Sequence, residues 1–86
     1  MGVIKMRFIE EYQTIINQLM KSDISFKVNM EKELIEIEDI YVDVEEGWTN
    51  EPVCYSVYAR DRGRSFNLDE VEEVITEIQE LMVRPD

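Results

Sequence analysis

Several residue types that usually carry chemistry are scarce in this chain, which has no histidine, one cysteine and nine basic side chains among 86 residues. Without histidine it lacks both the commonest general base and the commonest metal ligand. A lone cysteine cannot form an internal disulfide, so we expect an intracellular protein. No apolar run approaches the roughly 18 residues of a membrane-spanning helix, and the N-terminus lacks the apolar core of a signal peptide. We therefore expect neither a membrane span nor a signal peptide.

Glycine is equally sparse, and Gly2, Gly47 and Gly63 stand alone, so the chain has no glycine-rich phosphate loop. Cys54 has no histidine to activate it and lies inside a predicted strand, which favours a small buried residue over a nucleophile. Carboxylate pairs are so frequent in this chain that they carry no signal for acid–base catalysis. The acidic segment 39–51 does not fit the spacing of a calcium-binding EF-hand loop. We therefore expect no enzyme activity, no cofactor and no metal site.

Negative charge is what the chain has in excess, since 20 Asp and Glu against nine Lys and Arg give a net charge of −11. The length allows one domain, residues 1–86, with one core. Hydrophobic residues make up 44% of the chain, which is typical of a globular protein. Such acidity excludes sequence-independent binding of nucleic acid and argues against docking on anionic membranes, because both need clustered lysine and arginine.

The hydrophobic pattern predicts an N-terminal helix followed by strands. Apolar residues at helical spacing, from Phe8 to Met20, predict a helix over residues 4–21. Alternation predicts strands at 24–30 and 53–60. Residues 34–44 also alternate, but the phase slips between Ile37 and Ile40, so they form one bulged strand or two short pieces. Residues 45–52 are predicted to be a loop, and residues 60–64 a turn.

A second helix is predicted at the C-terminal end. Asn67 is a favourable N-cap residue, Glu70 follows at capping-box spacing, and Phe66 with Val71 matches a hydrophobic staple. The apolar stripe continues to Met82. The element order predicts an α+β fold in which N- and C-terminal helices flank a small three-stranded antiparallel sheet (α-β-β-β-α). Both helices should cover one sheet face, and the opposite face should carry Leu34, Tyr41 and Tyr58.

The negative charge is concentrated in two segments. Residues 31–52 hold nine acids and one lysine (net −8), and residues 69–86 hold seven acids and one arginine (net −6). Spacings of three, four and three place four carboxylates in a row on the predicted C-terminal helix. Such a row can stand in for the phosphates of a nucleic acid, or it can simply be a solvated face that keeps the protein soluble. The sequence leaves both interpretations open.

Trp48, in the acidic loop, is either an aromatic anchor for a partner or a cap that folds back on the sheet. Arg60, Arg62 and Arg64 form a small basic turn. Such a turn can grip a phosphate or a partner carboxylate, but more often it neutralises nearby acids, here those of the last helix.

In its length, its predicted helix–three strands–helix order and its acidic blocks at residues 31–51 and 69–80, the chain resembles the small acidic anti-CRISPR proteins of phages. The resemblance covers the whole chain and implies that it occupies the DNA-binding surface of a CRISPR effector nuclease. Colicin-type immunity proteins are similar in size and acidity, but they are all-helical, and the strands predicted at 24–30 and 53–60 depart from that pattern.

These observations predict a non-enzymatic inhibitor that binds a basic nucleic-acid-handling protein by DNA mimicry, with a CRISPR effector nuclease as the candidate partner. It would act in the cytoplasm, that of a bacterial host if phage-encoded, as a monomer or homodimer, without contacting nucleic acid or membrane. The alternative is an intracellular interaction domain that is acidic only for solubility and self-associates through its exposed sheet face. The candidate partner-binding residues are Glu36, Glu38, Asp43, Glu45, Glu46, Trp48, Glu70, Glu73, Glu77 and Glu80.

Overall fold

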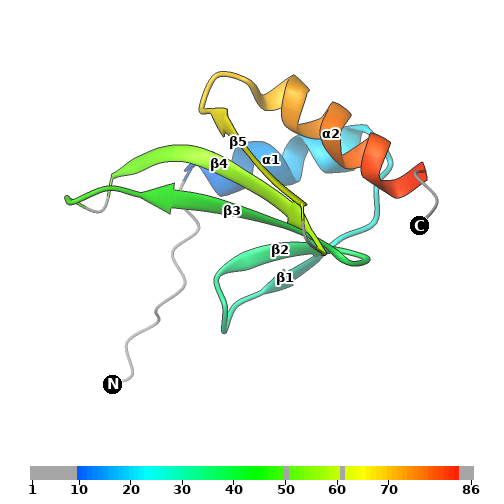
Figure 1. The fold of residues 1–86 in the computed structure, drawn as a ribbon, viewed down its shortest axis with the longest axis horizontal. Coiled ribbons are helices and arrows are strands. Elements are labelled where there is room, and N and C mark those ends of the chain that lie inside the picture. Colours follow the sequence, from blue (N-terminus) through cyan, green and yellow to red (C-terminus); the bar gives the residue numbers. More distant parts are fainter. Residues whose placement is uncertain (1–9, 50, 61, 84–86) are drawn as a thin grey trace.

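The computed structural model describes residues 10–49, 51–60 and 62–83. Two helices enclose five strands in chain order (Figure 1). The elements are α1 (Glu10–Lys21), β1 (Lys27–Asn29), β2 (Leu34–Ile37), β3 (Ile40–Glu46), β4 (Pro52–Ala59), β5 (Arg62–Asn67) and α2 (Val71–Val83).

The five strands form one antiparallel sheet in the order β1-β2-β3-β4-β5, so the α+β class is correct and the prediction of a three-stranded sheet is wrong. Residues 34–44 are two strands, because Ile37 pairs with Ile40 across a tight turn in which Glu38 has a φ of 56°. The change of phase in the apolar alternation between Ile37 and Ile40 therefore marks the turn of a β-hairpin. The predicted basic turn is shorter than expected, since Arg62 already pairs with Ala59 and opens β5. Only Phe66 of β5 is buried, so this edge strand has no alternating apolar pattern.

Side chains alternate between a core face and an open face of the sheet. Cross-strand neighbours such as Ile35, Val42 and Val57 are buried and lie on the core face. Both helices pack on that face, because α1 and α2 contribute Ile15 and Val74 to the same buried cluster. In Figure 1, β3 and β4 pass in front of α1, and no described element covers the open face.

Helix α1 ends in a Schellman motif. The N–H of Ile24 donates to the carbonyl of Leu19 over 3.0 Å, and the N–H of Asp23 donates to that of Met20 over 3.1 Å. Asp23 occupies the left-handed position of this motif, with a φ of 60°. The segment 24–26, predicted as strand, only leads into β1, although Ile24 is buried in the core. Residues 4–9 of the predicted helix lie outside the described residues.

Helix α2 begins later than its capping signal predicts. Asn67 is the last residue of β5, and the first helical hydrogen bond runs from the Val74 N–H to the Glu70 carbonyl over 3.1 Å. The Glu70 carboxylate nevertheless accepts the Asn67 backbone N–H over 2.9 Å. This is the contact that the glutamate of a capping box makes. Neither described helix is long and apolar enough to cross a membrane.

Candidate functional site

The predicted acidic residues are divided between two layers of the molecule. Glu36, Asp43 and Glu45 alternate with buried residues of β2 and β3, so they lie on the open face of the sheet. Glu73 and Glu80 belong to α2, which packs on the core face. The structure therefore does not bring the two acidic segments onto one plane.

A tyrosine pair occupies the centre of the open face. Tyr41 of β3 and Tyr58 of β4 are directly opposed, with ring centroids 5.5 Å apart and ring planes 33° apart. Glu36 is opposite Tyr41 on the other side, and Asp43 is close enough for its charge to raise the pKa of Tyr58, together with the larger effect of burial. Beyond Tyr58 the next position is Gly63, which has no side chain to cover the ring. Both rings are half-buried.

The carboxylates of the open face are held by neutral hydrogen-bond donors. Glu36 Oε2 accepts from Asn29 Nδ2 over 2.7 Å, and Glu45 Oε2 accepts from the Ser56 hydroxyl. Asp43 Oδ1 lies 2.8 Å from the Tyr12 hydroxyl. These donors fix the positions of the carboxylates without cancelling their charge. Among the described residues, the basic side chain on this face belongs to Lys27, which pairs with Glu36 across β1 and β2 at the edge of the sheet.

Tyr12 of α1 reaches the edge of β3 and ties the helix layer to the open face. Its buried hydroxyl accepts the Val44 N–H over 3.2 Å and lies 2.5 Å from the Glu33 carbonyl oxygen. With one proton, the hydroxyl can donate to either Glu33 or Asp43 at a given moment. Burial and the nearby Asp43 carboxylate raise the pKa of Tyr12 far above its usual value, so the phenol is neutral.

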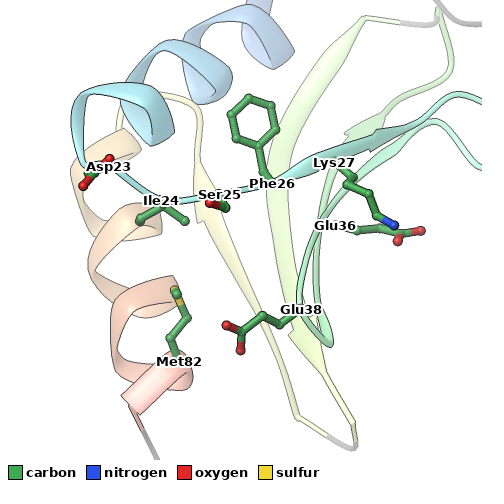
Figure 2. A pocket seen from close by; sticks show the side chains of 8 residues that line it. All are labelled: Asp23, Ile24, Ser25, Phe26, Lys27, Glu36, Glu38 and Met82. Carbon is green, nitrogen blue, oxygen red and sulfur yellow. The ribbon is translucent and has the colours of Figure 1, made fainter.

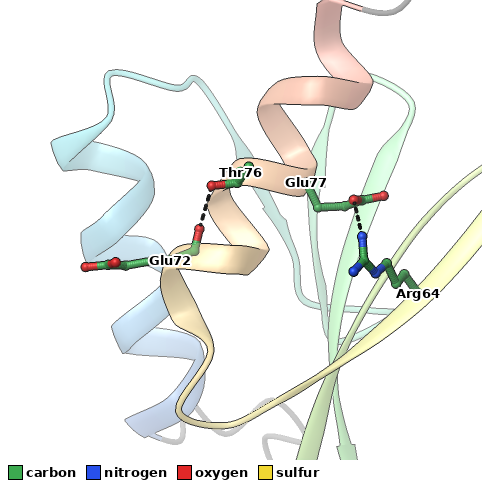
Figure 3. Close-up of polar contacts among 4 residues, drawn as sticks. All are labelled: Arg64, Glu72, Thr76 and Glu77. Carbon is green, nitrogen blue, oxygen red and sulfur yellow. Dashed lines mark hydrogen bonds and ion pairs between the residues drawn. The ribbon is translucent and has the colours of Figure 1, made fainter.

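The row of acids on α2 is not uniform. Glu77 pairs with Arg64 of β5, with Oε1 and Nη1 3.2 Å apart, and its side chain is only 12% exposed (Figure 3). The expectation that Glu77 lies on a free acidic face is therefore wrong. The Glu70 carboxylate accepts the backbone N–H of Asn67, whereas Glu73 and Glu80 are exposed. Figure 3 also shows Glu72 on the opposite side of α2 from Glu77.

Two of the three arginines of the β4–β5 hairpin, Arg60 and Arg64, pair with acids within the molecule. Arg60 Nη2 lies 2.8 Å from Asp39 Oδ2 in the β2–β3 turn, a partner that the sequence did not suggest. Arg64 pairs with α2 as expected, and its guanidinium also lies 5.0 Å from the centre of the Phe66 ring. Arg64 therefore links β5 to the helix layer.

The β3–β4 loop presents Trp48 to solvent. Its side chain is fully exposed at 104%, so it does not fold back over the sheet. Val53, near the start of β4, is 56% exposed. Glu46 closes β3 next to this loop and is also exposed. The hairpin tip is therefore an aromatic projection bordered by negative charge.

A cleft of about 480 Å³ lies between β1, the β2–β3 turn and the end of α2 (Figure 2). Glu38 points into it, with Asp23 on one side and Glu36 on the other. Its apolar wall is formed by Ile24, Phe26 and Met82. This cleft extends the negative surface from the open face towards the helix layer.

The sequence expectations also concern the candidate metal-binding groups and the thiol of the described residues. No group of three or more Cys, Asp and Glu side chains among them is placed to hold a metal ion. Burial and the Glu45 carboxylate raise the pKa of Cys54, so its thiol is protonated at neutral pH and poorly nucleophilic.

Comparisons of the chain with protein-family models, with curated proteins and with solved structures give no match.

Proposed function

We propose that this protein is a non-catalytic inhibitor that binds the nucleic-acid-binding surface of a basic protein in the cytoplasm. CRISPR effector nucleases are the candidate targets, on the resemblance stated above. The observation that carries the proposal is the unbalanced charge of the folded protein. The described residues, 10–49, 51–60 and 62–83, contain 18 Asp and Glu side chains but only six Lys and Arg side chains. These counts leave out Asp61, Asp86, Lys5, Arg7 and Arg84, which lie outside those ranges.

Such an excess of negative charge lowers the stability of the folded state, and solubility alone does not require so large an excess. Like charges repel across the surface and destabilise the compact state. Glu72, Glu73 and Glu80 on α2, and Asp69 just before it, are exposed with no described ion pair. A partner with a basic groove relieves this repulsion, and its field speeds the encounter.

Self-association through the open face is the weaker alternative. Leu34, expected to be exposed there, is buried at 7% exposure, so the apolar area is small. A symmetric dimer would also bring Glu36, Asp43 and Glu45 of each copy close to those of the other. Like charges at an interface disfavour association.

The test is displacement of labelled DNA from a guide-loaded CRISPR effector nuclease, followed by fluorescence anisotropy as salt is raised. We expect displacement at low salt that weakens as the Debye length falls below about 8 Å. Absence of displacement at low salt from a panel of such nucleases and other basic DNA-binding proteins would contradict the proposal.

Three variants with equal net charge distinguish binding through a particular acidic surface from an effect of net charge alone. Glu73→Gln with Glu80→Gln changes the net charge from −11 to −9, and Gln13→Lys with Gln79→Lys does the same at exposed positions. Glu36→Gln with Glu45→Gln makes the matching change on the open face. If one acidic pair binds the target, its variant loses more than the lysine variant. Equal losses in all three would show that net charge alone acts.

A further inference from the structure

The open face of the sheet combines two chemical features that together select one kind of side chain. We infer that it docks a partner segment bearing arginine, with a guanidinium lying against the Tyr41–Tyr58 pair and bonded to Glu36 or Asp43. This inference rests on the proposed function and deepens it, because it names the face and the side chain that are recognised.

The tyrosine pair supplies a surface for a flat cation. A guanidinium stacks on aromatic faces and is more weakly hydrated than an ammonium group, so it gives up less water on docking. The two rings span the middle strands β3 and β4, with centroids 5.5 Å apart. Gly63 leaves the outer side of Tyr58 uncovered, which provides a path onto the ring from the β5 edge.

The carboxylates supply matching acceptors in fixed positions. Glu36 flanks Tyr41 across the β2–β3 pairing, and Asp43 lies two residues along β3 from Tyr41. The described hydrogen bonds of these side chains use Glu36 Oε2 and Asp43 Oδ1, so each carboxylate presents a second oxygen. Carboxylates held in place before binding lose little freedom when a guanidinium pairs with them.

The same features disfavour nucleic acid on this face. Aromatic side chains on open sheets can stack bases, but those surfaces also carry positive charge that tracks the phosphates. Here Glu36 and Asp43 both border Tyr41, and among the described residues of this face the basic side chain is Lys27. Phosphates would be repelled where an arginine is attracted.

The experiment titrates the full chain with an oligoarginine peptide and with an oligolysine peptide of the same length, using calorimetry and amide chemical shifts. We expect arginine to bind about three- to tenfold more tightly, the range that a cation–π contact supplies. The shifts should centre on β3 and β4. Tyr41→Leu with Tyr58→Leu should abolish the preference and leave lysine binding unchanged.

Gly63→Val provides a test that does not depend on the double variant folding. A Cβ at Gly63 would lie 3.5 Å from Tyr58 Cβ, an ordinary contact, so valine fits the strand while covering the ring. Arginine binding should weaken while the unfolding midpoint is kept or raised. Equal affinity for both peptides, or shifts confined to the helix layer, would overturn the inference and leave the proposed function standing. If neither peptide binds at low salt, the proposed function fails as well.

Discussion

The hydroxyl of Tyr12 lies 2.8 Å from Asp43 Oδ1, joining the first helix to a carboxylate of the open face. The same hydroxyl accepts the Val44 N–H at the edge of β3. Tyr12→Phe removes the acceptor and leaves a buried N–H without a partner. We expect a loss of about 1–3 kcal/mol in the free energy of unfolding, measured by chemical denaturation. Tyr55→Phe is the matched control, because no hydrogen bond is described for the Tyr55 hydroxyl, and it should change little.

Stability should fall at alkaline pH. Burial raises the pKa of Tyr12, Tyr55 and Tyr58 above the ordinary value of 10.0, so the folded protein keeps protons that the unfolded chain releases. The unfolded state then binds fewer protons above pH 10, and the free energy of unfolding decreases as pH rises. Denaturation curves on either side of pH 10, with tyrosinate absorbance recorded in parallel, measure the effect. A Tyr12→Phe variant should show a shallower decrease, and equal slopes would contradict this assignment.

The start of α2 should depend on Glu70 more than on Asn67. The Glu70 carboxylate accepts the backbone N–H of Asn67, a contact that no change of the Asn67 side chain removes. Glu70→Ala is expected to cost about 0.5–1.5 kcal/mol. Asn67→Ala should cost less, which separates this geometry from an N-cap at Asn67. Thermal melts of both variants at the same pH decide between the two starts.

Asp23→Gly should stabilise the protein. Asp23 has a φ of 60° at the end of α1, where glycine is the usual residue, and its charge faces the negative end of the helix dipole. We expect a gain of about 1 kcal/mol. Ser22→Gly is the neighbouring control and should give no gain, because Ser22 is not in a left-handed conformation. Asp23→Asn isolates the contribution of the charge.

The sequence predicted the elements that bury a regular stripe and missed the one that does not. The helices and the long strand over Pro52–Ala59 follow their apolar periods, so periodicity was sufficient for them. Strand β5 buries Phe66 alone and is held by backbone pairing with β4, which no local pattern reveals. The Ile37–Ile40 slip was visible, but only the pairing register distinguishes a bulge from a hairpin.

The contacts of the candidate acidic residues could not be predicted from their spacing in the sequence. Glu77 is at the same helical spacing as its neighbours, yet Arg64 of β5 pairs with it. The sequence suggested that the basic turn neutralises acids of the last helix, but the choice of Glu77 depends on β5, a strand that the sequence did not predict. In the same way, Tyr41 and Tyr58 were expected on the open face, but their stacking requires the β3–β4 register. The hydrogen bonds of Tyr12 to β3 could not be predicted from the sequence, because a tyrosine in an apolar helical stripe suggests only packing.

The order of the strands in the sheet also determines how the chain can reach its fold. Each strand pairs with its neighbour in sequence, so each pairing closes only a short loop. Chains whose contacts are mostly local fold quickly for their size. The contacts of the helices are less local, and the contact between α1 and α2 spans the longest stretch of sequence, because these helices precede and follow all five strands. If that contact forms after the hairpins, substitutions between the helices will accelerate unfolding and leave the folding rate almost unchanged.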